Sequence, residues 1–412
     1  MPHTTHAPRV RSHLRGMLAL SAAQALVFAA TTAAGIAMMI HVARQYGPAA
    51  AGVVAAGGGL PWLIGSGFGG QVADLLTAHG RRTLGVVLAT TAIAVTAAIA
   101  VFGFTHLPDH GAGPVLYWAG VQFVLSAITT VKNSLARLAL LDLDPGSTTK
   151  NWFARLDRAS FQVGVSVGGL VAAVLDSRPP ELCAWLLLGA AAISGAVFVA
   201  IFPPERERRH SAGVWLRLRV LPPAGLTPAL RTSLGVLAVA GLFGAQQQAL
   251  WPITATQLGV DGLMGWMRMA AALSGLAALT ITAATPARQG ALVRGGAWLL
   301  GGACALFASA QWLPLPVAVG AAVAASAGHG FAVALLLVGT RQMAAVAAPP
   351  AQVGEVTGWT SLPVNGFAVI TGPLVGLASG AFGVGPVWAV SAAGVLAGTA
   401  LVLHHPFGKL GT

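Results

Sequence analysis

Strongly polar side chains interrupt the long apolar stretches of this 412-residue chain. Their amide, imidazole and cationic groups can hold a solute by hydrogen bonds or by charge. No nucleophile is paired with a base, so the pattern does not favour an enzyme. No Gly-x-x-x-x-Gly-Lys loop for ATP occurs, and no cofactor is expected. The polar residues are Gln24, Gln122, Lys132, Asn133, Gln162, Gln246, Gln247, Gln248, Arg268, His329 and Asn365.

The apolar stretches that carry these residues are predicted to cross a membrane. Hydrophobic residues make up 56% of the chain and charged residues only 8%, too little polar surface for a soluble globule of this size. Because a bilayer core needs about 20 apolar residues per helix, the sequence predicts twelve spans in an all-α membrane protein. Their limits are 17–43, 48–76, 83–106, 115–141, 152–176, 182–203, 230–256, 260–283, 290–311, 315–341, 352–380 and 384–404.

The basic residues predict which way the chain is threaded. Most of the 23 Lys and Arg fall in every second gap between spans, whereas only Arg44 and Arg178 fall in the alternate gaps. This positive-inside pattern puts both termini in the cytoplasm of a bacterial plasma membrane. The basic loops are expected to attract anionic lipid, so a pI near 11.4 does not predict a nucleic-acid partner. Cys183 and Cys304 each lie within a span, so neither a disulfide framework nor a metal site is expected.

A charged linker is predicted to divide the chain into two halves of six helices. The segment from Pro203 to Pro228 is rich in Arg and Glu and cannot cross lipid. The predicted domains are therefore residues 1–203, a cytoplasmic linker at 204–229, and residues 230–412. Within the linker, 214–221 is either an interfacial helix or a solvated loop. The Gly-Gly-Leu-Val at 168–171 recurs as Gly-Pro-Leu-Val at 372–375, which favours a parallel repeat with a binding site between the halves.

Every third span lacks strongly polar residues in its interior. The spans at 83–106, 182–203, 290–311 and 384–404 are therefore predicted to face lipid. This period resembles the major facilitator superfamily, in which these helices are peripheral and the others line a central cavity. Residues 70–74 (Gly-Gln-Val-Ala-Asp) and 80–82 (Gly-Arg-Arg) resemble the family's signature loop, although extra residues separate them and Leu75 replaces an Arg. Residues 158–164 and the glycines at 164, 168 and 169 resemble the family's bacterial drug and siderophore exporters.

The resemblance implies a secondary active transporter that works by alternating access. The sequence favours efflux of a drug or natural product, with a proton-coupled uptake symporter as the alternative. A membrane sensor or scaffold that keeps the fold without transport is a third hypothesis. The expected partners are a small-molecule substrate, protons and membrane lipid.

Several polar residues are predicted to share one membrane depth. At 1.5 Å per residue, Gln24, Gln162, His329 and Asn365 lie about 10–21 Å from the face where each helix starts. Repeat-built transporters bind substrate at that level. The alternative is that each side chain makes one interhelical hydrogen bond. Of the three consecutive glutamines, Gln247 shares a helical face with Trp251, which is expected to stack on a flat substrate.

The charges within the spans predict the substrate's charge. Lys132 and Arg268 are cationic, whereas the carboxylates lie near span ends or outside the spans. A site for lipophilic cations is expected to hold a buried carboxylate, so a neutral or anionic substrate is favoured, with both cations in the binding site. The alternative for Lys132 is that its side chain reaches the inner membrane face near Arg137.

Two further roles are predicted from residue type. Asp74 is expected to accept hydrogen bonds from Arg81 or Arg82 as a gating lock, unless the arginines only hold the loop inside. His329 is the candidate for proton coupling, because its unperturbed pKa of about 6.5 lies in the physiological range and no carboxylate shares its depth. In the alternative, His329 only bonds a neighbouring helix where Gly328 and Gly330 let backbones approach.

Overall fold

Helices make up nearly all of the chain that the structure describes. The computed structural model describes residues 7–64, 72, 76, 81–108, 110–142, 150–201, 226–244, 248–284, 289–347, 360 and 362–404, and no β-strand occurs in these ranges. The elements are α1 (Ala7–Ile64), α3 (Arg82–His106), α4 (Ala112–Asp142), α5 (Lys150–Leu175), α6 (Glu181–Ile201), α7 (Pro228–Val239), the π-helix η1 (Ala240–Gly244), α8 (Leu250–Leu258), α9 (Leu263–Ala284), α10 (Gln289–Ala310), α11 (Leu315–Ala347), α13 (Leu362–Gly366), α14 (Ala368–Phe382) and α15 (Val384–His404).

Eight of the described helices are long and apolar enough to cross a membrane, so the protein is a multi-pass membrane protein. The longest of them, α1, consists of two helices joined at Gly47. Gly47 has φ 82°, a left-handed conformation that glycine adopts without strain. Pro48 follows at the start of the second helix, where its missing N–H leaves no bond unmade. The predicted spans 17–43 and 48–76 meet at this turn.

The helix predicted at 230–256 is interrupted. The chain passes from α7 into the π-helix η1, which ends at Gly244, and α8 begins at Leu250. Pro252 lies in the first turn of α8, where it can neither donate a backbone hydrogen bond nor fit against the carbonyl four residues earlier. Hydropathy predicted a single helix here, because a change of helical pitch does not alter the apolar character of the residues. The described part of the span at 352–380 is also divided, into α13 and α14 with Phe367 between them.

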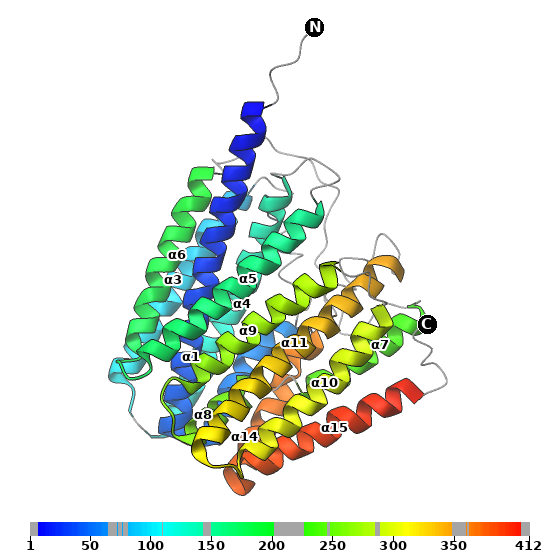
Figure 1. The fold of residues 1–412 in the computed structure, drawn as a ribbon. Coiled ribbons are helices and arrows are strands. Elements are labelled where there is room, and N and C mark those ends of the chain that lie inside the picture. Colours follow the sequence, from blue (N-terminus) through cyan, green and yellow to red (C-terminus); the bar gives the residue numbers. More distant parts are fainter. Residues whose placement is uncertain are drawn as a thin grey trace.

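The helices form two groups that are inclined to each other (Figure 1). We call α1 and α3 to α6 the first helix group, and α7 to α15 the second helix group. The contacts between the groups are made chiefly by α1 with α14 and by α5 with α9. The pairs α3 with α6 and α10 with α15 pack at the outer edges of their groups (Figure 1). These edge helices expose large apolar side chains, as a lipid-facing surface requires; examples are Leu88, Phe102, Trp185, Trp298 and Leu401.

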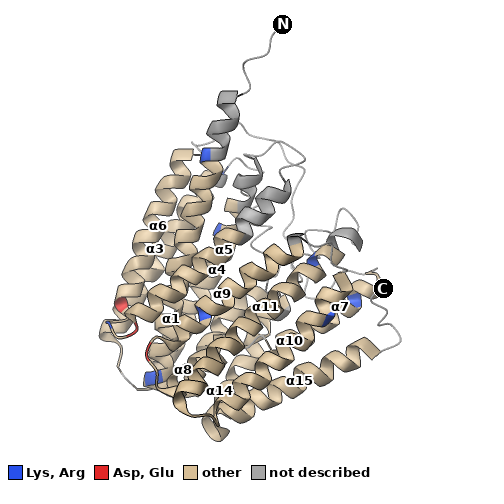
Figure 2. Ribbon diagram, viewed as in Figure 1, with Lys and Arg blue, Asp and Glu red and all other residues tan. Residues whose placement is uncertain are grey.

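The two ends of the bundle differ in charge (Figure 2). At one end, called the Arg44 end, the turn at Gly47 lies with the α3–α4, α5–α6, α8–α9, α10–α11 and α14–α15 connections, which contact one another. Three acidic residues lie at this end: Asp176, Glu181 and Asp261. Arginines occur at the opposite end, called the N-terminal end: Arg15, Arg81, Arg231, Arg294 and Arg341.

Candidate functional site

An ion-pair cluster joins the two helix groups at the Arg44 end. Arg44 of α1 donates to both carboxylate oxygens of Asp176, which follows α5, at 3.3 and 3.1 Å. The same guanidinium donates to Asp261, between α8 and α9, at 2.9 Å. The backbone N–H of Gly262 also donates to Asp176, at 2.6 Å. We call Arg44, Asp176 and Asp261 the Arg44 clamp.

The Arg44 clamp was not predicted from the sequence. Arg44 stood out only as an exception to the distribution of basic residues. One feature of the sequence could have indicated the clamp: the few charged residues predicted at this end include both basic and acidic ones. Such charges can pair across the two groups.

Glycines let the two groups approach closely near the same end. A Cβ added at Gly52 of α1 would lie 2.2 Å from the backbone oxygen of Gly372 of α14. A Cβ added at Gly265 of α9 would lie 2.4 Å from the backbone oxygen of Gly169 of α5. Neither position has room for any side chain. Small residues are what close packing between membrane helices requires.

Two of the predicted site residues are buried within the first helix group. Gln24 is 1% exposed, and within the described part of the chain neither its amide oxygen nor its amide nitrogen has a hydrogen-bond partner. Lys132 is 2% exposed, so its side chain does not extend to the surface as the alternative proposed. No ion pair to Lys132 occurs within the described ranges. One turn along α4, Leu135 packs with Met17 and Leu20 of α1, so Lys132 lies close to the stretch of α1 that leads to Gln24.

Two other predicted residues lie at the contact between the groups. Gln162 of α5 reaches α9, because a Cβ added at Gly275 would lie 2.8 Å from its amide nitrogen. Asn365 of α13 lies against Gly59 of α1, where the nearest atom to an added Cβ is the Asn365 backbone oxygen, at 2.8 Å. The structure therefore brings Gln162 and Asn365 to the interface between the groups.

Trp251, Arg268 and His329 form a cluster inside the second helix group. The Arg268 guanidinium lies over the Trp251 ring, 5.0 Å from its centroid. The His329 ring approaches Trp251 edge-on, with centroids 5.2 Å apart. Trp251 is fully buried, and the ring face under Arg268 is occupied by that cation. In this conformation that face is not available for the substrate stacking that we expected.

His329 is tied to the interrupted helix. Its Nε2 is 2.9 Å from the backbone oxygen of Gly244, the last residue of the π-helix η1. The adjacent Gly330 packs against α9, since an added Cβ would lie 2.1 Å from the Ala271 oxygen. This geometry is the one that the alternative role for His329 requires. Proton coupling at His329 stays a prediction.

The predicted gating lock falls mostly outside the described residues. Asp74, Gln247 and the side chain of Arg82 are not described. Arg81 is exposed, and its backbone N–H donates to the Leu76 oxygen at 2.8 Å. The lock therefore also stays a prediction.

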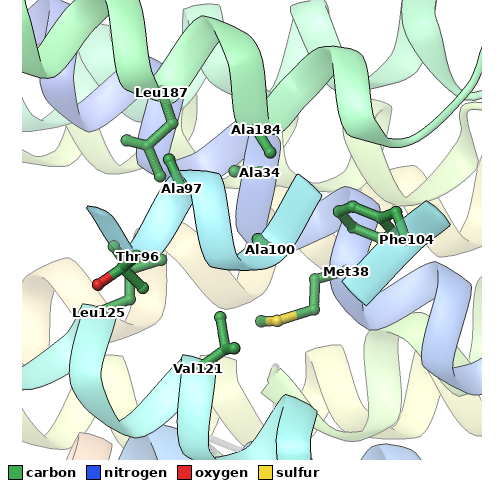
Figure 3. A pocket seen from close by; sticks show the side chains of 10 residues that line it. All are labelled: Ala34, Met38, Thr96, Ala97, Ala100, Phe104, Val121, Leu125, Ala184 and Leu187. Atoms are coloured by element: carbon green, nitrogen blue, oxygen red, sulfur yellow. The ribbon is translucent and has the colours of Figure 1, made fainter. Parts of the chain in front are cut away.

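A small apolar cavity lies within the first helix group (Figure 3). Its volume of about 10 Å³ has room for about one water molecule. Thr96 is the only polar residue in its wall, and the Thr96 hydroxyl already donates to the Ala92 oxygen at 2.7 Å. The cavity is a packing defect between α1, α3, α4 and α6, and it does not contain the polar groups of a substrate site. Its walls are Ala34, Met38, Thr96, Ala97, Ala100, Phe104, Val121, Leu125, Ala184 and Leu187.

Comparisons with known proteins identify the class of fold. The sequence matches no protein-family model and no curated protein. The nucleoside transporter NupG superposes with a TM-score of 0.66 at 14% identity, covering 94% of this chain and 98% of that one. A bacterial homologue of the iron transporter ferroportin, in an inward-facing state, gives 0.68 at 14% identity, with 95% and 98% covered. The human organic anion transporter MFSD10 gives 0.62 at 15% identity, with 95% and 99% covered.

These neighbours are transporters of the major facilitator type, not enzymes. At such low identity the likeness shows the fold alone. The chain therefore has the fold of these multi-pass membrane transporters.

Proposed function

We propose that this protein is a secondary active transporter that exports a small neutral or anionic organic molecule by alternating access. The proposal includes twelve membrane helices, with halves at residues 1–203 and 230–412 joined by the linker at 204–229. It places the protein in a bacterial plasma membrane with both termini in the cytoplasm, so that the Arg44 end is external. Uptake coupled to protons is the second candidate; the structural neighbours include a nucleoside transporter and a peptide transporter of the POT family.

The Arg44 clamp is the observation that carries this proposal. Alternating access needs an external closure that can form and break, and ion pairs between two rigid groups are a closure of that kind. The clamp and the glycine contacts close the Arg44 end in this structure. We assign it to an inward-facing state, the state also named for the ferroportin homologue among its neighbours.

The charge of the buried groups supports the proposed substrate class. Lys132 and Arg268 are cations within the helices, whereas the carboxylates of Asp176, Glu181 and Asp261 lie at the Arg44 end. A buried cation is costly in lipid unless it serves a bound anion or a polar cavity. We assign substrate contacts to Gln24, Gln162, Gln247, Trp251, Asn365, Lys132 and Arg268, and proton coupling to His329.

The test compares the wild-type protein with a variant that cannot close at the Arg44 end. In Gly372→Leu, even the Cβ would lie 2.6 Å from the Gly52 backbone oxygen, so the two groups cannot come together there. Both proteins are expressed in an efflux-deficient bacterium, the cells are incubated with a mixture of neutral, anionic and cationic compounds, and the compounds retained in the cells are measured by mass spectrometry. Export predicts that wild-type cells retain less of some neutral or anionic compounds than Gly372→Leu cells do.

The same measurement separates the alternatives. Higher retention in wild-type cells would establish uptake instead. Equal retention of every compound would contradict transport of this substrate class. A Gly380→Leu variant is the control, because Gly380 also lies in α14 but an added Cβ meets no atom within 4 Å.

A further inference from the structure

Two glutamine side chains from opposite helix groups meet over a single glycine. A Cβ added at Gly58 of α1 would lie 3.0 Å from Gln122 Nε2 of α4 and 3.2 Å from Gln248 Oε1, just before α8. Both amides therefore lie against the same point of the α1 backbone. Gly58 is about 16 Å along the helix from Gly47, which is near the middle of a membrane span.

Hydrogen bonds to the backbone are made near each glutamine in the chain. One turn along α4 from Gln122, the Ser126 hydroxyl donates to the Gly58 oxygen at 2.9 Å and fixes α4 against α1. Gln248 lies in the interrupted helix, between the π-helix η1 and α8. The backbone oxygen at the end of η1, that of Gly244, is in turn bonded to His329.

The amide oxygens of Gln122 and Gln248 are both buried, and neither has a hydrogen-bond partner among the residues that the structure describes. A buried acceptor without a donor destabilises a folded protein, and most buried polar groups are therefore paired. At the point over Gly58 the two amides, one from each helix group, present the Gln122 nitrogen, which is a donor, and the Gln248 oxygen, which is an acceptor. A ligand that carries both a donor and an acceptor can therefore pair with both glutamines.

We propose that Gln122 and Gln248 form a subsite for the amide-like edge of an uncharged planar substrate. A primary carboxamide presents an acceptor beside a donor, so it pairs through two parallel hydrogen bonds with any group that carries an N–H beside a C=O. Lactams, imides and primary amides have that edge. Because one glutamine belongs to each group, a bound substrate links the two groups. This assignment rests on the proposed function, since it names the substrate class of the same transporter.

Matched pairs of small amides test the subsite on the purified full-length protein in detergent. The pairs are 2-pyrrolidinone with N-methyl-2-pyrrolidinone, succinimide with N-methylsuccinimide, and benzamide with N,N-dimethylbenzamide, each at millimolar concentration. Tryptophan fluorescence reports the unfolding temperature. At least one parent amide should raise the unfolding temperature of the wild-type protein, and its methylated partner should not, because methylation removes the donor.

Variants connect any such shift to the two glutamines. Gln122→Leu and Gln248→Leu should abolish the shift, and each should raise the unfolding temperature without ligand by about 1–3 °C, because each removes an unpaired buried amide. Gly58→Ala should also abolish the shift, since its Cβ would lie 2.9 Å from Gln122 Cγ and displace that side chain. Gln311→Leu is the control. The Gln311 amide nitrogen is also buried and has no partner among the described residues, but Gln311 follows α10 at the Arg44 end, so the shift should persist in this variant.

Three results would overturn the subsite. They are equal shifts by parent and methylated compounds, no shift by any compound, and a lower unfolding temperature for both leucine variants without ligand. The last result would mean that the amides stabilise the empty protein. A selective shift in a protein that fails the transport comparison would support the subsite and contradict only the proposed function.

Discussion

Replacing Arg44 with Gln removes the one side chain that joins Asp176 and Asp261. The guanidinium is 39% exposed and Asp261 is 71% exposed, so water screens this ion pair. Exposed ion pairs stabilise a structure by about 0.2–1 kcal/mol, and the Arg44–Asp261 pair should stabilise closure by an amount at the low end of that range. Asp176 is only 14% exposed and accepts two hydrogen bonds from Arg44. The Arg44–Asp176 pair should therefore stabilise closure by an amount at or above the upper end of the same range. Together the contacts stabilise closure at the Arg44 end by about 1–2 kcal/mol.

That free energy sets the expected change in population. A loss of about 1–2 kcal/mol changes the ratio of closed to open molecules by about 5- to 30-fold. Gln retains part of the aliphatic side chain of Arg and remains polar. The difference between Arg44→Gln and wild type therefore reports the effect of losing the charge and the two-pronged hydrogen bonding of the guanidinium. Arg44→Lys should give an intermediate effect, because an ammonium group cannot make the same two-pronged contact.

Spin labels at positions 110 and 312 can measure this ratio by pulsed electron spin resonance. Both residues are exposed, and they lie at the Arg44 end in opposite helix groups. The native Cys183 and Cys304 are buried and can stay in place. When the Arg44 end opens, the distance between the two labels becomes longer. The fraction of molecules with this longer distance should increase in Arg44→Gln, and raised salt should increase it in the wild-type protein.

The matched control is Arg178→Gln, which removes the same charge from the same end. Arg178 is exposed and makes no ion pair within the described ranges. Its distance distribution should equal that of the wild type. Equal distributions for Arg44→Gln and wild type, or an equal change in Arg178→Gln, would refute the clamp as a gate.

Two further predictions concern the buried ionisable groups. Lys132→Met should raise the unfolding temperature, because it removes a buried cation whose insertion costs about 2.5–3.5 kcal/mol, and it should reduce transport of anions more than of neutral compounds. A lower unfolding temperature would mean that Lys132 has a structural partner. His329→Gln should abolish substrate accumulation driven by a pH gradient in proteoliposomes while equilibrium binding is retained, because Gln can still form a hydrogen bond to Gly244 but cannot titrate. Undiminished uphill transport would mean that His329 serves only to make the hydrogen bond to Gly244.

The sequence alone predicts the membrane class and the broad arrangement. Stretches such as 83–106 and 384–404 are apolar along their whole length, and this property depends on the residues themselves, not on their neighbours. The same is true of the mid-span polar residues, since a Gln or Lys in lipid must face protein or water wherever its helix packs. These predictions required only composition and spacing.

Only the tertiary structure determines which of these groups meet. Arg44 and Asp261 are 217 residues apart, and no local pattern pairs them. The orientation of Arg268 over Trp251 depends on how α8 and α9 pack, and hydropathy is insensitive to that packing. Gln122 and Gln248 likewise meet over Gly58 only because the helix that carries Gln248 is interrupted and because the residue of α1 at this point is a glycine, which has no side chain. Side-chain contacts of this kind depend on distances of a few ångströms between segments far apart in the chain, and those distances are set by packing.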